Sequence, residues 1–259
     1  MRTLIGRWRT AFGFLLLFLL WEAGVHVFGV REYILPPPSQ VLRALAKNWQ
    51  PVLANAGMTS LEIVAGYALA IVVSIPLAVG IVFSRAMEET VYPVVVFLQI
   101  VPKIAVAPLF IIWFGFGFTP KLLLVFLLSF FPIVIDAAVG LRSMSSEMND
   151  LARSMGSSRI QIFTRFRLPT SLPYLFSGLK VAATLAIAGA VVGEFVGADK
   201  GLGYLLLVTN SNMETALMFA TLVGLTLIGL LFFYSVEFLE TLLIPWHVTH
   251  RVREESGTM

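Results

Sequence analysis

Long apolar runs separated by short polar segments dominate this chain. Six runs of at least 18 residues carry few charges, and they cover residues 11–28, 59–83, 91–114, 122–141, 179–196 and 216–238. A helix of about 20 apolar residues crosses the hydrocarbon core of a bilayer. The pattern therefore predicts an all-α polytopic membrane protein with six transmembrane helices, organised as a single domain over residues 1–259.

Composition supports this class and excludes several others. Hydrophobic residues make up 58% of the 259 residues and charged residues only 13%, which is about half the charged fraction of soluble domains. The absence of cysteine excludes disulfides, thiolate catalysis and Cys-ligated metals. A net charge of +3 is too small to indicate nucleic-acid binding. His26, His247 and His250 are the only histidines, and they suggest neither a catalytic triad nor a metal site.

The distribution of basic residues predicts the orientation in the membrane. One set of segments carries eleven, namely Arg2, Arg7, Arg9, Arg85, Arg142, Arg153, Arg159, Arg165, Arg167, Arg251 and Arg253. The other set carries five, namely Arg31, Arg43, Lys47, Lys121 and Lys200. The positive-inside rule then places both termini in the cytoplasm. The first run resembles a secretory signal without a cleavage site, and we interpret it as a retained anchor.

The outer loop at residues 29–58 predicts a short amphipathic helix. Ser39 follows three prolines and is a suitable N-cap, and the apolar face would consist of Val41, Leu42, Leu45 and Trp49. Such a helix typically lies at the membrane interface. The alternative is a docking platform for an external partner.

The longest cytoplasmic connection, residues 142–178, predicts a helix–turn–helix element. Its first helix has one apolar face made of Met148, Leu151, Ala152 and Met155, which we expect to pack on the protein's own spans. Gly156 supplies a left-handed stop, Ser157 or Ser158 caps a second short helix, and Leu168-Pro169 ends it. A pair of surface helices bound to anionic lipid is the alternative.

The spacing within this connection resembles a known signature. Asp150-Leu151-Ala152, then three residues, Gly156, nine residues and Phe166-Arg167-Leu168-Pro169 are similar to the EAA motif, E-A-A-x3-G-x9-I-x-L-P, of permease subunits of binding-protein-dependent ATP-binding-cassette (ABC) importers. Asp150 stands in place of Glu, Leu151 in place of the first Ala, and Phe166 in place of Ile. Further similar runs are Leu35–Ser39, Val101–Leu109, Gly193-Glu194-Phe195 and Gly201–Tyr204.

The chain thus resembles permeases of the nitrate, taurine, alkanesulfonate and bicarbonate group, with related permeases for pyrimidine precursors of thiamine and for riboflavin. The resemblance implies a type I importer permease fold in the bacterial inner membrane, with two copies of the chain forming a homodimer. It also implies two cytoplasmic ATPases, which bind ATP and magnesium, and an external substrate-binding protein. This chain has no phosphate-binding loop of its own. The residues implied in ATPase coupling are Asp150, Leu151, Ala152, Arg153, Ser154, Gly156, Arg159, Leu168 and Pro169.

Polar and small residues inside the runs suggest a translocation pathway. Lys103 lies mid-run between Pro102 and Pro108, which should break the helix. Lys103 then either faces the pathway, or it snorkels toward the headgroups or pairs with an acid such as Glu194. Gly189 and Gly193 permit close packing or line the path beside Glu194. Near the run ends, Glu62, Glu237 and Glu240 are expected to reach headgroups or pair locally.

Two other classes of function compete with the importer. In an ion-coupled secondary transporter, Lys103 and Glu194 would form a charge relay, but the 142–178 element would have no role. A membrane scaffold without transport would leave the charges within the runs unexplained. For an importer, Lys103 favours a small anion such as a sulfonate, taurine or nitrate, and the alternative solutes are a pyrimidine precursor of thiamine or riboflavin.

Overall fold

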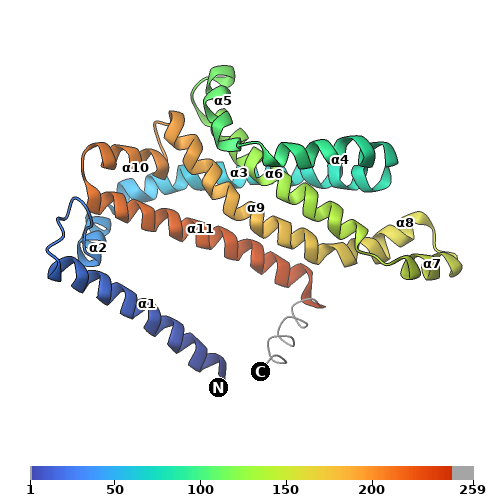
Figure 1. Cartoon of the computed structure of the whole chain (residues 1–259), viewed down its shortest axis with the longest axis horizontal. Coiled ribbons are helices and arrows are strands. Elements are labelled where there is room, and N and C mark those ends of the chain that lie inside the picture. Colours follow the sequence, from blue (N-terminus) through green and yellow to red (C-terminus); the bar gives the residue numbers. More distant parts are fainter. Residues whose placement is uncertain (1, 247–259) are drawn as a thin grey trace. The chain divides into compact units, whose positions relative to one another are not determined.

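The computed structural model describes residues 2–246, and all regular structure in that range is helical (Figure 1). His247, His250, Arg251 and Arg253 lie outside the described residues. The helices are α1 (Arg2–Val27), α2 (Pro38–Lys47), α3 (Trp49–Phe83), α4 (Arg85–Ile100), α5 (Ala107–Phe114), α6 (Phe118–Arg142), α7 (Ser146–Ser154), α8 (Arg159–Ile162), α9 (Leu168–Gly197), α10 (Leu202–Ser211) and α11 (Thr215–Leu243).

Four helices in the described range are long and apolar enough to span a membrane, namely α3, α6, the continuous helix Arg159–Gly197 and α11. A fifth span results if the bent pair Arg85–Ile100 and Lys103–Phe114 is one crossing. The predicted first span lies in α1, whose described apolar part is Phe12–Val27. The predicted count of six spans is therefore not confirmed, although most residues of each predicted run are helical.

The third predicted span is broken where its prolines are. Val101 has φ −59° and ψ 132°, and Pro102 has ψ 87°, so the backbone leaves the helical region before a 3-10 turn at Lys103–Val106. A residue that precedes proline is pushed toward extended backbone. The two helical parts meet at an angle of 88°, and the predicted break is confirmed.

The chain forms two packing units, one from Met1–Thr59 and Asp199–Leu227 and the other from Ser60–Ala198 and Ile228–Met259. In the first unit, Pro37 is the N-cap residue of α2, and Ser39 lies inside that helix. The amide and hydroxyl of Ser39 donate hydrogen bonds to Glu22, at 3.0 and 2.8 Å. The prediction that Ser39 caps α2 was wrong, because a carboxylate from α1 satisfies the start of this helix instead.

The second unit is built around the close contact of α6 with α9. A Cβ atom added at Gly189 would lie 2.9 Å from Cα of Val125, and one at Gly193 would lie 3.1 Å from Cα of Lys121. Gly178 and Gly140 are equally tight, since added Cβ atoms would lie 2.6 Å from Cβ of Asp136 and 2.8 Å from the carbonyl oxygen of Ser171. Small residues thus let the two backbones approach, as in other closely packed membrane helices.

This packing predicts the effect of enlarging a glycine. We expect Gly189→Val to lower the free energy of unfolding by about 1–3 kcal/mol, because the nearest atoms are backbone atoms of α6 that cannot move aside. Unfolding of the detergent-purified chain by SDS measures this effect. The matched control is Gly57→Val in α3, where an added Cβ meets no atom within 4 Å. Equal destabilisation by both variants would contradict the proposed role of close packing.

Candidate functional site

The connection between α6 and α9 forms the predicted helix–turn–helix element. Ser145 caps α7, and Ser158 caps α8 in a capping box with Gln161. Gly156 has φ +77°, and the amide of Ser157 donates to the carbonyl of Ala152 at 3.1 Å, while the amide of Gly156 donates to Arg153 at 2.9 Å. This pair of hydrogen bonds is a Schellman motif. The predicted glycine stop and the serine cap at Ser158 are confirmed.

The second half of the element continues directly into a span. A π-helical turn, Phe163–Arg167, joins α8 to α9, and Pro169 lies in the first turn of α9. Helix runs without interruption over the 39 residues Arg159–Gly197, and Figure 1 shows α8 leading into α9. The prediction that Leu168-Pro169 ends the short helix was wrong, because the wide π turn accommodates the proline within a continuous helix.

The apolar face of α7 is largely exposed. Ala152 is buried, but Met148, Leu151 and Met155 expose 44%, 60% and 73% of their surface. The expectation that this face packs on the protein's own spans is wrong for these three exposed side chains, and Ala152 alone is buried. On α8, Ile160 is also exposed. The element therefore presents apolar side chains that this chain does not cover.

The remaining residues implied in coupling lie on the same element. Asp150, Arg153, Ser154 and Arg159 are exposed, and the hydroxyl of Ser154 donates to the carbonyl of Leu151 at 2.8 Å. Leu168 and Pro169 open α9. At the start of α7, hydrogen bonds from the Glu147 amide and the Ser145 hydroxyl lower the pKa of Glu147, so its carboxylate stays charged at the positive end of the helix.

A buried cluster of three charged residues joins three helices of the second unit. Glu62 of α3 and Glu194 of α9 are fully buried, and Lys121 of α6 is 2% exposed. The ammonium group of Lys121 forms an ion pair with Glu62, and the carboxyl of Glu194 lies close enough to Glu62 to interact with it electrostatically. The sequence suggested that Glu62 reaches the headgroups or pairs locally. In the structure, Glu62 is instead buried between α6 and α9, beside Lys121 and Glu194.

Sequence reasoning missed this cluster, although the chain carries a signal for it. Glu62 lies at the start of one predicted span, Lys121 just before another, and Glu194 at the end of a third. Because successive spans alternate in direction, the predicted topology brings these three positions to the same end of the bundle. A burial penalty for each charge then favours their mutual contact.

The ammonium group of Lys103 contacts a backbone carbonyl and an aromatic ring. Its Nζ donates to the carbonyl of Gln99 at 2.6 Å and lies 4.7 Å from the ring centroid of Phe131. The pairing of Lys103 with Glu194, one of the predicted alternatives, is not among the ion pairs of the described residues. Gly189 and Gly193 lie against α6, as described above. The assignment of these residues to a translocation pathway remains a prediction.

A second ion pair ties α9 to α11. Nζ of Lys180 lies 2.6 Å from Oε2 of Glu240, which is 2% exposed. Glu240 was expected to reach the headgroups or to pair locally. It is instead buried against a lysine of another helix, so that two glutamates near span ends serve inter-helix contacts.

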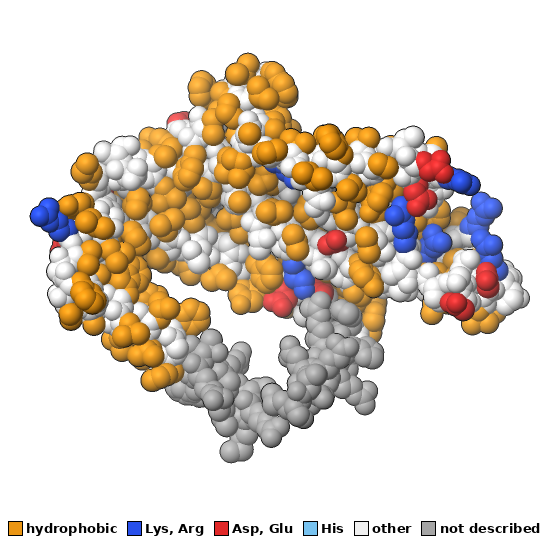
Figure 2. Space-filling model, viewed as in Figure 1, with side chains coloured by type: hydrophobic (Ala, Val, Ile, Leu, Met, Phe, Trp, Pro, Cys, Tyr) orange, Lys and Arg blue, Asp and Glu red, His pale blue; other side chains and the backbone are white. Residues whose placement is uncertain are grey.

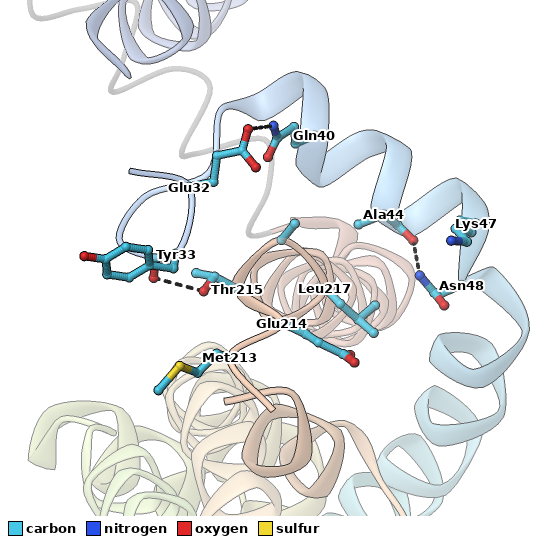
Figure 3. Close-up of a pocket in the computed structure, with 11 residues that line it drawn as sticks. Glu32, Tyr33, Gln40, Ala44, Lys47, Asn48, Met213, Glu214, Thr215 and Leu217 are labelled. Carbon is cyan, nitrogen blue, oxygen red and sulfur yellow. Dashed lines mark hydrogen bonds between the residues drawn. The ribbon is translucent and has the colours of Figure 1, made fainter. Parts of the chain in front are cut away.

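An open cavity of about 640 Å³ lies in the first unit (Figure 3). Its polar groups largely satisfy one another. Gln40 donates to Glu32, Thr215 donates to the carbonyl of Tyr33 at 3.0 Å, and Asn48 donates to the carbonyl of Ala44 at 2.9 Å. These bonds fasten the loop before α2 to α2 itself and to the start of α11, which indicates a structural role for this cavity.

Comparison with known proteins supports a membrane transport role. A family model described as "Binding-protein-dependent transport system inner membrane component" matches residues 66–246. The formylaminopyrimidine transport permease protein ThiX of Halalkalibacterium halodurans is 36% identical over 90% of this chain and 93% of its own length. The taurine transport system permease protein TauC of Escherichia coli is 28% identical over 89% of this chain and 86% of its own length.

Among solved structures, an inward-facing conformation of the MetNI methionine ABC transporter matches the fold. The match has a TM-score of 0.63 and 19% identity, and it covers 73% of this chain and 94% of that chain. This likeness concerns the fold alone. Together with the family match, it confirms the predicted all-helical permease fold and the resemblance on which that prediction rested.

The charge cluster predicts a large effect of removing its cation. Lys121→Met should lower the free energy of unfolding by about 3–5 kcal/mol, because Glu62 would remain buried without its counter-ion. SDS unfolding of the purified chain measures this change. Lys103→Met, which removes a lysine without an ion pair, should cost much less, and the double variant Lys121→Met/Glu62→Gln should recover part of the loss. Equal stability of the two single variants would contradict this account.

Proposed function

Because this chain belongs to the family of binding-protein-dependent transport system inner membrane components, we propose that its α7–α8 element couples ATP hydrolysis on a partner protein to solute uptake. The chain is a multi-pass inner membrane permease subunit of an ABC importer. As a permease it is not itself the catalytic subunit, and the ATPase function belongs to a partner.

The observation that carries the coupling proposal is the continuity of the element with α9. A coupling element must be stiff, must expose a surface for the ATPase and must be attached to a helix that moves. The Schellman turn at Gly156 and the capping box at Ser158 make it stiff. Leu151, Met155 and Ile160 expose apolar surface, and the unbroken helix Arg159–Gly197 connects that surface to the core of the second unit.

In the proposed cycle, ATP closes a dimer of ATPases and thereby moves the two elements seated on them. Each element belongs to one copy of this chain, so that the importer would contain a permease homodimer, two cytoplasmic ATPases with ATP and magnesium, and an external substrate-binding protein. Both termini would be cytoplasmic, on the side of the α7–α8 element. Alternating access then follows from rigid-body motion of the two permease copies.

An ion-coupled secondary transporter is less well supported. Its charge relay would need Lys103 and Glu194 in contact, but the Lys103 ammonium group bonds to Gln99 and lies over Phe131. Such a transporter would also have no use for the exposed apolar face of α7.

For the solute, we propose a small nitrogen heterocycle of the formylaminopyrimidine kind rather than the sulfonate-like anion that Lys103 suggested. The Lys103 ammonium group is already engaged by a carbonyl and a ring, which weakens the argument for an anion. The relative named for formylaminopyrimidine transport is 36% identical to this chain, and the relative named for taurine is 28% identical. A taurine-like solute remains the alternative.

The coupling proposal predicts a specific defect in a variant of the turn. Gly156→Val should weaken association with the cognate ATPase and abolish most ATP-driven uptake, because β-branched residues strongly disfavour a positive φ. Co-purification of the ATPase and uptake into proteoliposomes measure both effects. Gly156→Asn is the matched control, since asparagine tolerates this conformation, and it should retain most of the activity. Normal association and uptake in Gly156→Val would contradict the proposal.

The proposed solute class predicts the outcome of a competition assay. Cells that produce the complete importer should accumulate labelled formylaminopyrimidine, and excess unlabelled compound should suppress this uptake, whereas excess taurine should not. The matched control is the same strain with the permease gene deleted. Uptake of labelled taurine that depends on the permease, without uptake of the heterocycle, would overturn the solute class and leave the coupling proposal intact.

A further inference from the structure

A cavity beside the α7–α8 element collects three arginines. Its volume is about 200 Å³, and its lining residues are Val82, Phe83, Asn149, Arg153, Arg159, Ile162, Phe163 and Arg167. Figure 2 shows Lys and Arg side chains near α7 and α8, with Asp and Glu side chains among them, while hydrophobic side chains cover much of the rest of this face. The cavity therefore combines a high density of positive charge with an apolar wall.

These three arginines lack acidic partners. Arg153, Arg159 and Arg167 form no ion pair with a carboxylate in the part of the chain that the structure describes. By contrast, Arg85 pairs with Glu89 and Arg142 pairs with Glu88. An anion that enters this cavity can accept charge-assisted hydrogen bonds from the three guanidinium groups.

The apolar part of the wall comes from the end of a span. Val82 and Phe83 are the last residues of α3, and the ring of Phe83 packs on that of Phe163 with centroids 5.3 Å apart. Cζ of Arg167 lies 5.7 Å from the centroid of the same Phe83 ring. A cationic pocket against the apolar end of a membrane helix is the arrangement that holds an anionic lipid headgroup with its acyl chains in the bilayer.

We propose that this cavity binds the phosphate group of an anionic phospholipid of the inner leaflet. Arg153, Arg159 and Arg167 would donate hydrogen bonds to the phosphate oxygens, and the acyl chains would run along α3 past Phe83. The inference rests on the proposed orientation, which places α7 and α8 at the cytoplasmic surface. The bound lipid would hold the α7–α8 element at a fixed height on the membrane.

An acidic side chain of the partner ATPase is the competing occupant, and the geometry of α7 disfavours it. Asn149 and Arg153 are one turn apart and share the face of α7 that lines the cavity. The exposed apolar residue Leu151 projects from another face of the same helix. The ATPase can therefore seat on the apolar surface without entering the arginine cavity.

Native mass spectrometry of the full chain tests this proposal, with phosphatidylglycerol as the anionic probe and phosphatidylcholine as the zwitterionic probe. Wild-type chain should retain phosphatidylglycerol in preference to phosphatidylcholine. Arg167→Gln should lower the affinity for phosphatidylglycerol about five- to tenfold, because it removes one of three donors. Arg165→Gln is the matched control, since Arg165 lies in the same π turn with the same charge but outside the cavity lining, and it should change affinity less than twofold.

Several results would overturn the proposal. Equal losses in the two variants would show that net charge alone attracts the lipid. If inorganic phosphate displaces the lipid and binds as tightly as phosphatidylglycerol does, the cavity is a site for free phosphate, and the acyl chains contribute nothing to binding. Loss of ATPase association in Arg167→Gln with unchanged lipid retention would assign the cavity to the ATPase. Arg159→Gln should reproduce the lipid defect if Arg167→Gln proves poorly folded.

ATPase co-purification from the same preparations separates this inference from the coupling proposal. Normal lipid retention in a Gly156→Val chain that has lost its ATPase would support the lipid site and the coupling element together. Normal ATPase association in a chain that shows no preference for phosphatidylglycerol would overturn the lipid site alone.

Discussion

The close approach of α6 and α9 is the constraint on which the second unit depends. Glycines at positions 140, 178, 189 and 193 leave no room for a Cβ atom between the two helices, and alanines of α9 fill the rest of the contact. The α7–α8 element is the connection between these same two helices. A force on that element is therefore applied to a pair of spans that cannot easily slide apart, because their backbones are already in contact.

The buried charges extend this constraint to a third and a fourth helix. Lys121 and Glu194 connect α6 and α9 to Glu62 of α3, and Lys180 connects α9 to Glu240 of α11. Burying charges in this way costs free energy that their mutual attraction does not fully return. Such contacts do, however, fix one arrangement of the helices, because any shift would leave a charge without its partner at membrane depth. The unit can then move as a body during transport.

Local features of this fold were predictable from the sequence, whereas features that depend on distant residues were not. Gly156 and Ser158 were predictable because a left-handed stop and a helix cap depend on only a few neighbouring residues. The continuation of helix through Pro169 was missed, since a proline normally marks an end and only the π turn before it removes the clash. The partner of Glu62 was missed because Lys121 and Glu194 lie on other helices. The exposure of Leu151 was missed because an apolar stripe in a sequence does not show whether this chain or another protein covers it.

The central claim is that the α7–α8 element and α9 move as one rigid body. The natural chain contains no cysteine, so cysteines introduced at Ile160 in α8 and Thr184 in α9 can be spin-labelled without background. Their distance, measured by pulsed electron paramagnetic resonance in the assembled importer, should be the same without nucleotide and with ATP trapped. The distance between the two copies of the Ile160 label should change. A change in the Ile160–Thr184 distance on ATP binding would show that the helix bends at the π turn, and it would contradict the account.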